Sequence, residues 1–161
     1  MDERVEIIDV LARYVRAIED RDGDALVALF APAGRFEVLS RRGKEEYVTH
    51  ALEMVGHEAL RAAMKTGELP PGHSMQYLTT DHIVDIAGDE ARLRAQFLAV
   101  QAVGKSRPED GWPSGAGLMQ GTLTPIMIGH YDSHLRRIGG RWVFTRHQVK
   151  HSVPMTLPLK S

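Results

Sequence analysis

The chain has 161 residues, of which 43% are hydrophobic and 25% charged, a balance that suits one globular domain with its own core. A net charge of −1 without a basic stripe argues against a nucleic-acid partner, and no apolar stretch approaches the roughly 20 residues of a membrane helix. Because cysteine is absent, disulfides, zinc–thiolate sites and cysteine nucleophiles are excluded. The acidic amino end lacks a signal-peptide pattern, so we expect a cytoplasmic protein without membrane contact.

The first part of the chain predicts helices. Apolar side chains recur at three- and four-residue steps from Ile8 to Ile18, after Asp2 as a candidate N-cap, and this pattern ends near residues 20–23. We expect a short second helix that ends before Pro32, because proline disfavours helix in the residue before it. A short strand is predicted over residues 35–39. Residues 45–65 are interpreted as a third helix with a break near Gly56.

The second part predicts two pairs of long strands. Residues 74–86 and 91–103 flank a tight turn at Gly88-Asp89, and residues 126–138 and 141–153 flank Gly139-Gly140, which supplies the positive φ angles of a hairpin turn. The segment 105–125 between the pairs is rich in glycine and proline, so we expect a long loop that acts as a lid or an interface segment. Helices followed by an antiparallel meander predict a single α+β domain over residues 1–161, with helices on one face of a curved sheet.

One face of the predicted strand 91–103 becomes apolar toward its end, where Leu98, Val100 and Ala102 alternate with inward residues. An apolar patch on the outer face of a sheet is typical of a contact between subunits. We therefore expect a homodimer or a higher homo-oligomer.

Several motifs occur in a fixed order along the chain: Arg13-Tyr14, Ile18 to Leu26, Leu29 to Pro32, Gly88 to Ala91, Gly129 to Asp132, Gly139 to Phe144, and Arg146. This ordered set resembles the SnoaL-like branch of the nuclear-transport-factor-2-like superfamily. The resemblance implies a cone in which the curved sheet wraps the helices and encloses an apolar pocket. Relatives such as scytalone dehydratase, bile-acid dehydratases and polyketide cyclases imply a cofactor-independent dehydratase, isomerase or cyclase. Its substrate would be a small hydrophobic oxygenated ring compound, such as a polyketide, sterol or terpenoid.

The same resemblance implies an acidic residue and a tyrosine on the first helix, which fall on Glu19 and Tyr14. The catalytic histidine of the lyase relatives falls on Gln76, and a further histidine of scytalone dehydratase falls on Gln101. Glutamine has no useful proton affinity, so Gln76 and Gln101 are expected to bind substrate by hydrogen bonds. Glu19 could then be the base, because a carboxyl that faces an apolar cavity has a raised pKa. The alternatives are a helix-end salt bridge for Glu19 and a core position for Tyr14.

The last hairpin offers a second source of a base, and its register decides which side chains face the pocket. A regular register turns Tyr131 and Arg146 toward the pocket and leaves His147 outside, opposite Asp132. A bulge after Phe144 instead turns His147 and His151 inward. Relatives carry functional basic residues at these two positions, so we favour the bulge. Either histidine could then shuttle protons at neutral pH.

Further residues receive weaker assignments. His130, Asp132 and His134 alternate on one strand, but the first and last would lie about 7 Å apart, so we expect no metal and no other cofactor. Tyr131, Arg146, Phe97 and His73 are also assigned to substrate binding, with His73 at the mouth of the pocket. Two rival hypotheses stay open: a non-catalytic binding domain for the same ligands, and an assembly module with a pocket plugged by Phe97, Met127 and Trp142, whose outer sheet face joins a larger partner.

Overall fold

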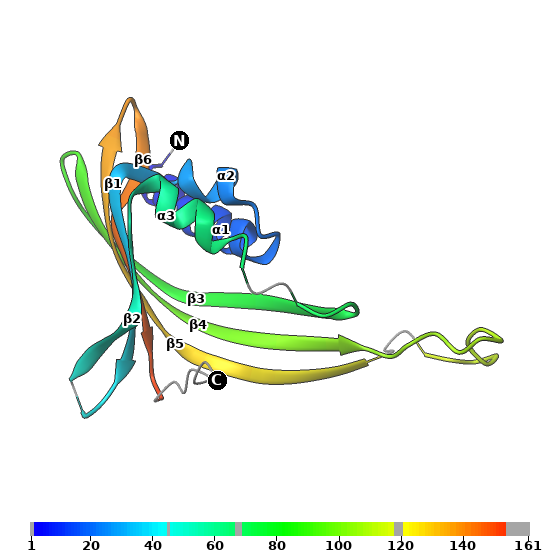
Figure 1. Cartoon of the computed structure of the whole chain (residues 1–161). Helices are drawn as coiled ribbons and strands as arrows, with labels where there is room; N and C mark the ends of the chain where they lie inside the picture. Colours follow the sequence, from blue (N-terminus) through cyan, green and yellow to red (C-terminus); the bar gives the residue numbers. More distant parts are fainter. Residues whose placement is uncertain (1, 45, 67–68, 118–120, 154–161) are drawn as a thin grey trace.

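A computed structural model describes residues 2–44, 46–66, 69–117 and 121–153 of the chain, and it has an α+β fold. The three helices α1 (Glu3–Glu19), α2 (Gly23–Val27) and α3 (Gly56–Ala63) gather against one face of a curved, unclosed sheet (Figure 1). The predicted fold class is therefore confirmed. Within the described ranges, no helix is long and apolar enough to cross a membrane.

Within the residues that the structure describes, the sheet has six strands in the order β2-β1-β6-β5-β4-β3. All neighbours are antiparallel except β1 and β6, which run parallel. The strands are β1 (Phe30–Arg41), β2 (Tyr47–Val55), β3 (His73–Ala87), β4 (Glu90–Gly104), β5 (Gly121–Ile138) and β6 (Arg141–His151). β3, β4 and β5 extend together well beyond the helices, and the β4–β5 loop lies at their far end (Figure 1).

Helix α1 forms where the sequence predicts it. The side chain of Asp2 caps the helix by accepting a hydrogen bond from the backbone N–H of Arg4 at 3.0 Å. Glu3 and Glu6 lie in the first turn, where the positive end of the helix dipole favours acidic residues. One face of the helix is buried against the sheet: Ile7, Val10, Leu11, Tyr14, Val15 and Ala17. This burial fixes α1 on the concave face.

The predicted helix over residues 45–65 is wrong in its first half. Residues 47–55 form strand β2, which pairs with β1, and only residues 56–63 are helical. The change of structure occurs at Gly56, whose φ of 82° is readily adopted only by glycine. The edge of β1 supplies backbone partners that a periodicity test on residues 45–65 alone does not detect.

Two other boundaries differ from the prediction. The second helix ends at Val27 and β1 already begins at Phe30, so the strand predicted over 35–39 is much longer. Strand β5 begins at Gly121, because residues 121–125 pair with the end of β4, and this shortens the predicted loop 105–125. The described part of that loop lies away from the helices (Figure 1). Residues 118–120 lie outside the described residues.

Among the register shifts of the sheet, those in β3 and β6 bear on the predicted site residues. Between β5 and β6 the register shifts so that Thr145 has no partner, directly after Phe144. The bulge favoured from the sequence is therefore confirmed. Between β3 and β4 the register shifts after Thr80, where Asp81 has a φ of 54°. Each bulge reverses the alternation of the strand that follows it.

Candidate active site

The centre of the concave face is a buried imidazole surrounded by aromatic rings. His147 is fully buried, and its ring centroid lies 4.2 Å from that of Tyr14 and 4.7 Å from that of Phe144. The rings of Phe36 and Phe30 follow at 5.9 and 6.3 Å. The space next to the imidazole is therefore filled by side chains.

Tyr131 extends this cluster along the concave face. Its ring stacks on His147 at 5.1 Å and on Phe97 at 4.7 Å. Phe97 in turn contacts His151 edge-to-face at 5.8 Å. Tyr131, His147 and His151 are all buried and face the helices, so the bulge at Thr145 brings both histidines to one side with Tyr131.

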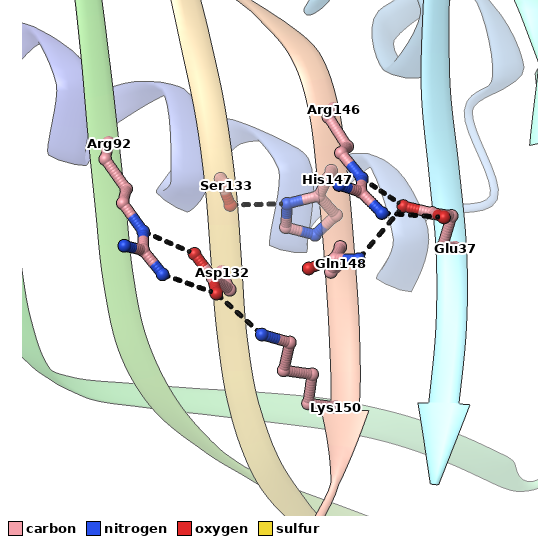
Figure 2. A network of polar contacts seen from close by, with 8 residues as sticks. All are labelled: Glu37, Arg92, Asp132, Ser133, Arg146, His147, Gln148 and Lys150. Atoms are coloured by element: carbon pink, nitrogen blue, oxygen red, sulfur yellow. Dashed lines mark hydrogen bonds and ion pairs between the residues drawn. The ribbon is translucent and has the colours of Figure 1, made fainter. Parts of the chain in front are cut away.

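A buried serine holds one nitrogen of His147. The Oγ of Ser133 on β5 lies 2.8 Å from Nδ1 of His147 on β6, and both residues are fully buried (Figure 2). The other nitrogen, Nε2, is buried without a hydrogen-bond partner among the described residues. Burial lowers the pKa of His147 to about 3, so the imidazole is neutral at physiological pH.

Three phenols converge on the same region from different elements. Burial raises the pKa of Tyr14 on α1, and the phenols of Tyr131 and Tyr77 raise it further. Burial and the nearby charge of Glu19 raise the pKa of Tyr77 to about 12. The pKa of Tyr131 is raised by burial, by Tyr77 and by Glu19. All three hydroxyls therefore stay protonated at neutral pH and can donate hydrogen bonds.

Glu19 closes the opposite side of this group of phenols. Its side chain is only 11% exposed, and Oε1 accepts a hydrogen bond from the backbone N–H of Tyr77 at 2.7 Å. Oε2 lies 3.3 Å from the guanidinium of Arg16, which is itself exposed. The helix-end salt bridge considered from the sequence is thus present, and the carboxylate also lies beside the phenols.

Gln76 is not where the resemblance implies. It is exposed and lies on the outer face of β3, while its neighbour Tyr77 packs against the core. Exposed and partly buried residues alternate regularly over residues 73–80, so Gln76 and Thr80 share the outer face of the strand before the bulge. The next residue, Tyr77, is the one whose backbone N–H contacts Glu19.

Arg146 also lies on the outer face, because the bulge that turns His147 inward turns its neighbour outward. Its guanidinium binds the buried carboxylate of Glu37, which also accepts a hydrogen bond from Gln148 (Figure 2). These contacts lower the pKa of Glu37. Arg146 is therefore an outer-face structural residue and does not line the aromatic interior.

A second carboxylate on the outer face, Asp132, lies between the histidines at 130 and 134 along β5. Asp132 accepts two hydrogen bonds from Arg92 at 2.9 Å and one from Lys150 at 2.6 Å, which hold its pKa far below the usual range (Figure 2). His130 and His134, on either side of it, are exposed. Asp132 is thus committed to two cations.

The remaining predicted residues lie around the core. Gln101 is half-buried and shares the inward face of β4 with Phe97. His73 is half-buried, and its Nδ1 lies 3.2 Å from the carbonyl oxygen of Pro71. An open cleft of about 650 Å³ at the end of α1 is lined by both His73 and Glu19. The structure therefore brings these two titratable residues to one surface.

Sequence reasoning missed Tyr77 and Ser133. Residues 74–80 contain polar and apolar side chains on both faces, so alternation alone does not show which side is buried. Ser133 is a small polar residue between Asp132 and His134, and its cross-strand position opposite His147 depends on the bulge. The register of the hairpin would have been the only signal for it.

Comparison with known families and structures agrees with this fold. The family model for the SnoaL-like domain matches residues 1–148. No curated protein matches the chain.

Solved structures of similar shape share little sequence with the chain. An NTF2-like protein with a cystatin-like fold from Novosphingobium aromaticivorans is 19% identical with a TM-score of 0.64, over 92% of this chain and 80% of that one. From the same organism, the assigned β subunit of an aromatic-ring-hydroxylating dioxygenase is 15% identical with a TM-score of 0.71, over 98% and 94% of the two chains. An assigned scytalone dehydratase is 16% identical with a TM-score of 0.63, over 99% and 90%. These likenesses establish the fold.

Proposed function

The chain belongs to the SnoaL-like domain family, and on that basis we propose that it is a cofactor-independent lyase or isomerase. It would abstract a proton from a small hydrophobic ring compound that carries oxygen, such as a polyketide, a sterol or a terpenoid. Dehydration, isomerisation and cyclisation all begin with this step. The likeness to an assigned scytalone dehydratase supports this class of reaction.

The observation that carries the proposal is the meeting of proton-handling groups within an aromatic interior. Glu19, the phenols of Tyr14, Tyr77 and Tyr131, and the imidazole of His147 come from four elements and influence or contact one another. Aromatic rings around them suit a flat hydrophobic ligand. A fold that needed only a core would place apolar side chains here.

The chemistry assigned to these groups is enolisation. Glu19, His147 or His151 takes the proton from the carbon next to a substrate carbonyl. The phenols of Tyr14 and Tyr131 donate hydrogen bonds to the oxygen as negative charge develops on it. Because their pKa values are raised, these phenols remain donors throughout the neutral range.

Access to the imidazole requires one of its aromatic neighbours to move. The ring of Tyr14 is the nearest at 4.2 Å, and it is carried by α1. Displacement of Tyr14 toward the ligand would open the cluster and keep its hydroxyl near the substrate oxygen. Rings packed around the groups that move protons exclude water from them.

Exchange of carbon-bound protons tests the proposal without knowledge of the true substrate. A panel of bicyclic and steroid ketones, including α-tetralone, would be incubated with the protein in D₂O and followed by proton NMR. We expect wild-type protein to accelerate exchange next to the carbonyl, and Glu19→Gln or His147→Gln to slow it by at least about 100-fold. His134→Gln is the matched control on the outer face. If the Glu19, His147 and His151 variants all exchanged protons at the wild-type rate, the proposal would be ruled out.

A second candidate function is assembly with another protein chain. Leu78, Leu98 and Ile128 lie side by side on the outer face of β3, β4 and β5, and Leu78 and Ile128 are 59% and 50% exposed. The assembly hypothesis also expects side chains such as Phe97 to fill the interior, and Phe97 is buried there. The likeness to an assigned dioxygenase β subunit supports this alternative, in which the partner is a second copy of this chain or a larger catalytic chain.

Mass measurements separate these candidates. Native mass spectrometry of protein from its own host would detect an unaltered ligand if the domain only binds, and a reaction product if it is an enzyme. An assembly function predicts an oligomer in sedimentation that Leu78→Lys with Ile128→Lys disperses. A monomeric wild-type protein that co-purifies with no other chain would exclude it.

A further inference from the structure

The hydrogen bond between Ser133 and His147 determines which nitrogen of the imidazole carries its proton. The two side chains meet at 2.8 Å in a fully buried place. Among the described residues, His147 is the only hydrogen-bond partner of the Ser133 hydroxyl, and Nε2 of His147 has none. A neutral imidazole carries one proton, on Nδ1 or on Nε2.

The two tautomers leave different groups unsatisfied. With the proton on Nδ1, the imidazole donates to Ser133, so the serine proton has no acceptor and the Nε2 lone pair has no donor. With the proton on Nε2, the serine hydroxyl donates to Nδ1 and only the Nε2–H lacks a partner. Because each unsatisfied buried polar group costs about 1–3 kcal/mol, the second arrangement is favoured.

We propose that Ser133 is a positioning residue that holds His147 as the Nε2–H tautomer, so that the imidazole donates a hydrogen bond into the aromatic interior and does not act as the base. The chemical use of this donor rests on the proposed function, but the tautomer does not. The low pKa of His147, about 3, agrees with a neutral imidazole.

This assignment adds the Nε2–H group of His147, which has no partner among the described residues, to two phenol donors in the same cluster. The rings of Tyr14 and Tyr131 are buried and both contact the His147 ring. Because the pKa of each phenol is raised by burial, both hydroxyls keep their protons and can donate hydrogen bonds. Three donors in a dry aromatic setting recognise a ligand oxygen that is negative or becoming negative. The ligand class is therefore an enolate or a phenolate.

The division of roles follows from charge balance. Glu19, an anionic carboxylate, receives the proton from carbon while the C–H electron pair shifts and the carbonyl oxygen becomes an enolate oxygen. The Nε2–H and phenol O–H groups donate hydrogen bonds to that oxygen and keep their protons. Protonated Glu19 then returns its proton to another carbon in an isomerisation, or to a departing hydroxide in a dehydration.

Nitrogen NMR tests the tautomer directly in the wild-type protein. Two-bond proton–nitrogen correlations distinguish Nε2–H from Nδ1–H, and His147→Gln identifies the signals by removing them. We expect Nε2–H in wild type and in Ser133→Thr, which keeps the hydroxyl, and a mixture of tautomers in Ser133→Ala. A wild-type Nδ1–H signal would overturn the inference and leave the proposed function standing with His147 as base.

Binding of 4-nitrophenol tests the ligand class, because its ionised form absorbs at longer wavelength. The protein is expected to bind the phenolate in preference to the neutral phenol, so that bound nitrophenol ionises at lower pH than free nitrophenol. Ser133→Ala should weaken phenolate binding about tenfold, as the loss of one aligned donor would, and Ser133→Thr should restore it. Absence of phenolate binding to wild type would overturn the assigned ligand class.

Discussion

The carboxylate of Glu19 caps the backbone N–H of Tyr77 at the open edge of the sheet, with Oε1 and N 2.7 Å apart. Strand β3 is an edge strand, and an uncovered edge is a template for unwanted pairing. Arg4, near the other end of α1, donates to the carbonyl of His82 on the same strand at 3.0 Å. Helix α1 is thus fastened along the edge of β3 at both ends, and this fixes Tyr14 between the two.

Glu19 variants separate this structural role from a catalytic one. Glu19→Gln keeps an oxygen that accepts from Tyr77, so we expect its free energy of unfolding to stay within about 0.5 kcal/mol of wild type. Glu19→Ala removes the acceptor and should cost about 1–3 kcal/mol. Urea unfolding gives both values. If Glu19 is the base, both variants lose ketone proton exchange. A fully active Glu19→Gln variant would show that Glu19 has only the structural role at the edge of the sheet.

Burial of His147 predicts a specific loss of stability in mild acid. Its pKa of about 3 lies below the value near 6.5 of an unfolded chain, so the unfolded state binds more protons between these pH values. Stability therefore falls as the pH drops below about 6.5, by about 2 kcal/mol between pH 7 and pH 5. In urea unfolding, the loss of stability of His147→Gln between pH 7 and pH 5 should be smaller than that of wild type by this amount. The loss of His134→Gln should equal that of wild type.

The ion-pair network around Asp132 should contribute more to stability than an exposed pair. Asp132 is only 10% exposed in its side chain and faces two cations, whereas Asp85 is 64% exposed beside Arg94. We expect Asp132→Asn to lower the free energy of unfolding by about 1–3 kcal/mol and Asp85→Asn by less than about 0.5 kcal/mol. If thermal and urea unfolding showed the same loss of stability for the two variants, the larger contribution of the network would be contradicted.

The same carboxylate gives a second pH dependence at lower pH. Since Arg92 and Lys150 hold the pKa of Asp132 below its unfolded value, its contribution is present above about pH 4 and disappears as the pH falls further. The difference in stability between wild type and Asp132→Asn should therefore shrink between pH 5 and pH 3. A difference that stays constant over this range would show that the charge of Asp132 is irrelevant.

Gly129 should tolerate no side chain. A Cβ built at this position would lie 2.1 Å from the carbonyl oxygen of Lys150 and 2.9 Å from the ring of Phe97. Gly129→Ala must therefore push β5 away from β6 and shift Phe97, at a cost of about 1–3 kcal/mol or more. Gly117→Ala is the control, because its Cβ would meet no atom within 4 Å. Thermal unfolding of both variants would reveal the difference.

The sequence predicts those elements whose signals are local. Asp2 and the apolar stripe suffice for α1, and the glycine turns at 88 and 139–140 suffice for the two long hairpins. Strand β2 was missed because its stability comes from pairing with β1, a contact between residues that no short window compares. The helical pattern of the following residues 56–63 also led the prediction to extend that helix backward over β2.

The site was predicted only where orientation follows from regular alternation or from the favoured bulge. Tyr14 contacts His147, and Glu19 contacts Tyr77 at the end of α1, but Gln76 and Arg146, which were assigned to substrate binding, lie on the outer face. In β3 the added residue Asp81 carries a left-handed backbone that its sequence does not demand. A single extra residue in a strand is invisible to composition, yet it exchanges every side chain beyond it.

Thr145 makes the length of β6 as important as its composition. Its hydroxyl donates to the carbonyl of His134 at 3.1 Å, and the unpaired residue leaves Phe144 and His147 on the same side of the sheet. Removal of one residue here would carry His147 into solvent and drive Arg146 among the phenylalanines, although no other residue had changed. Relatives of this protein should therefore vary more freely in the identity of residue 145 than in the number of residues between these two aromatic anchors.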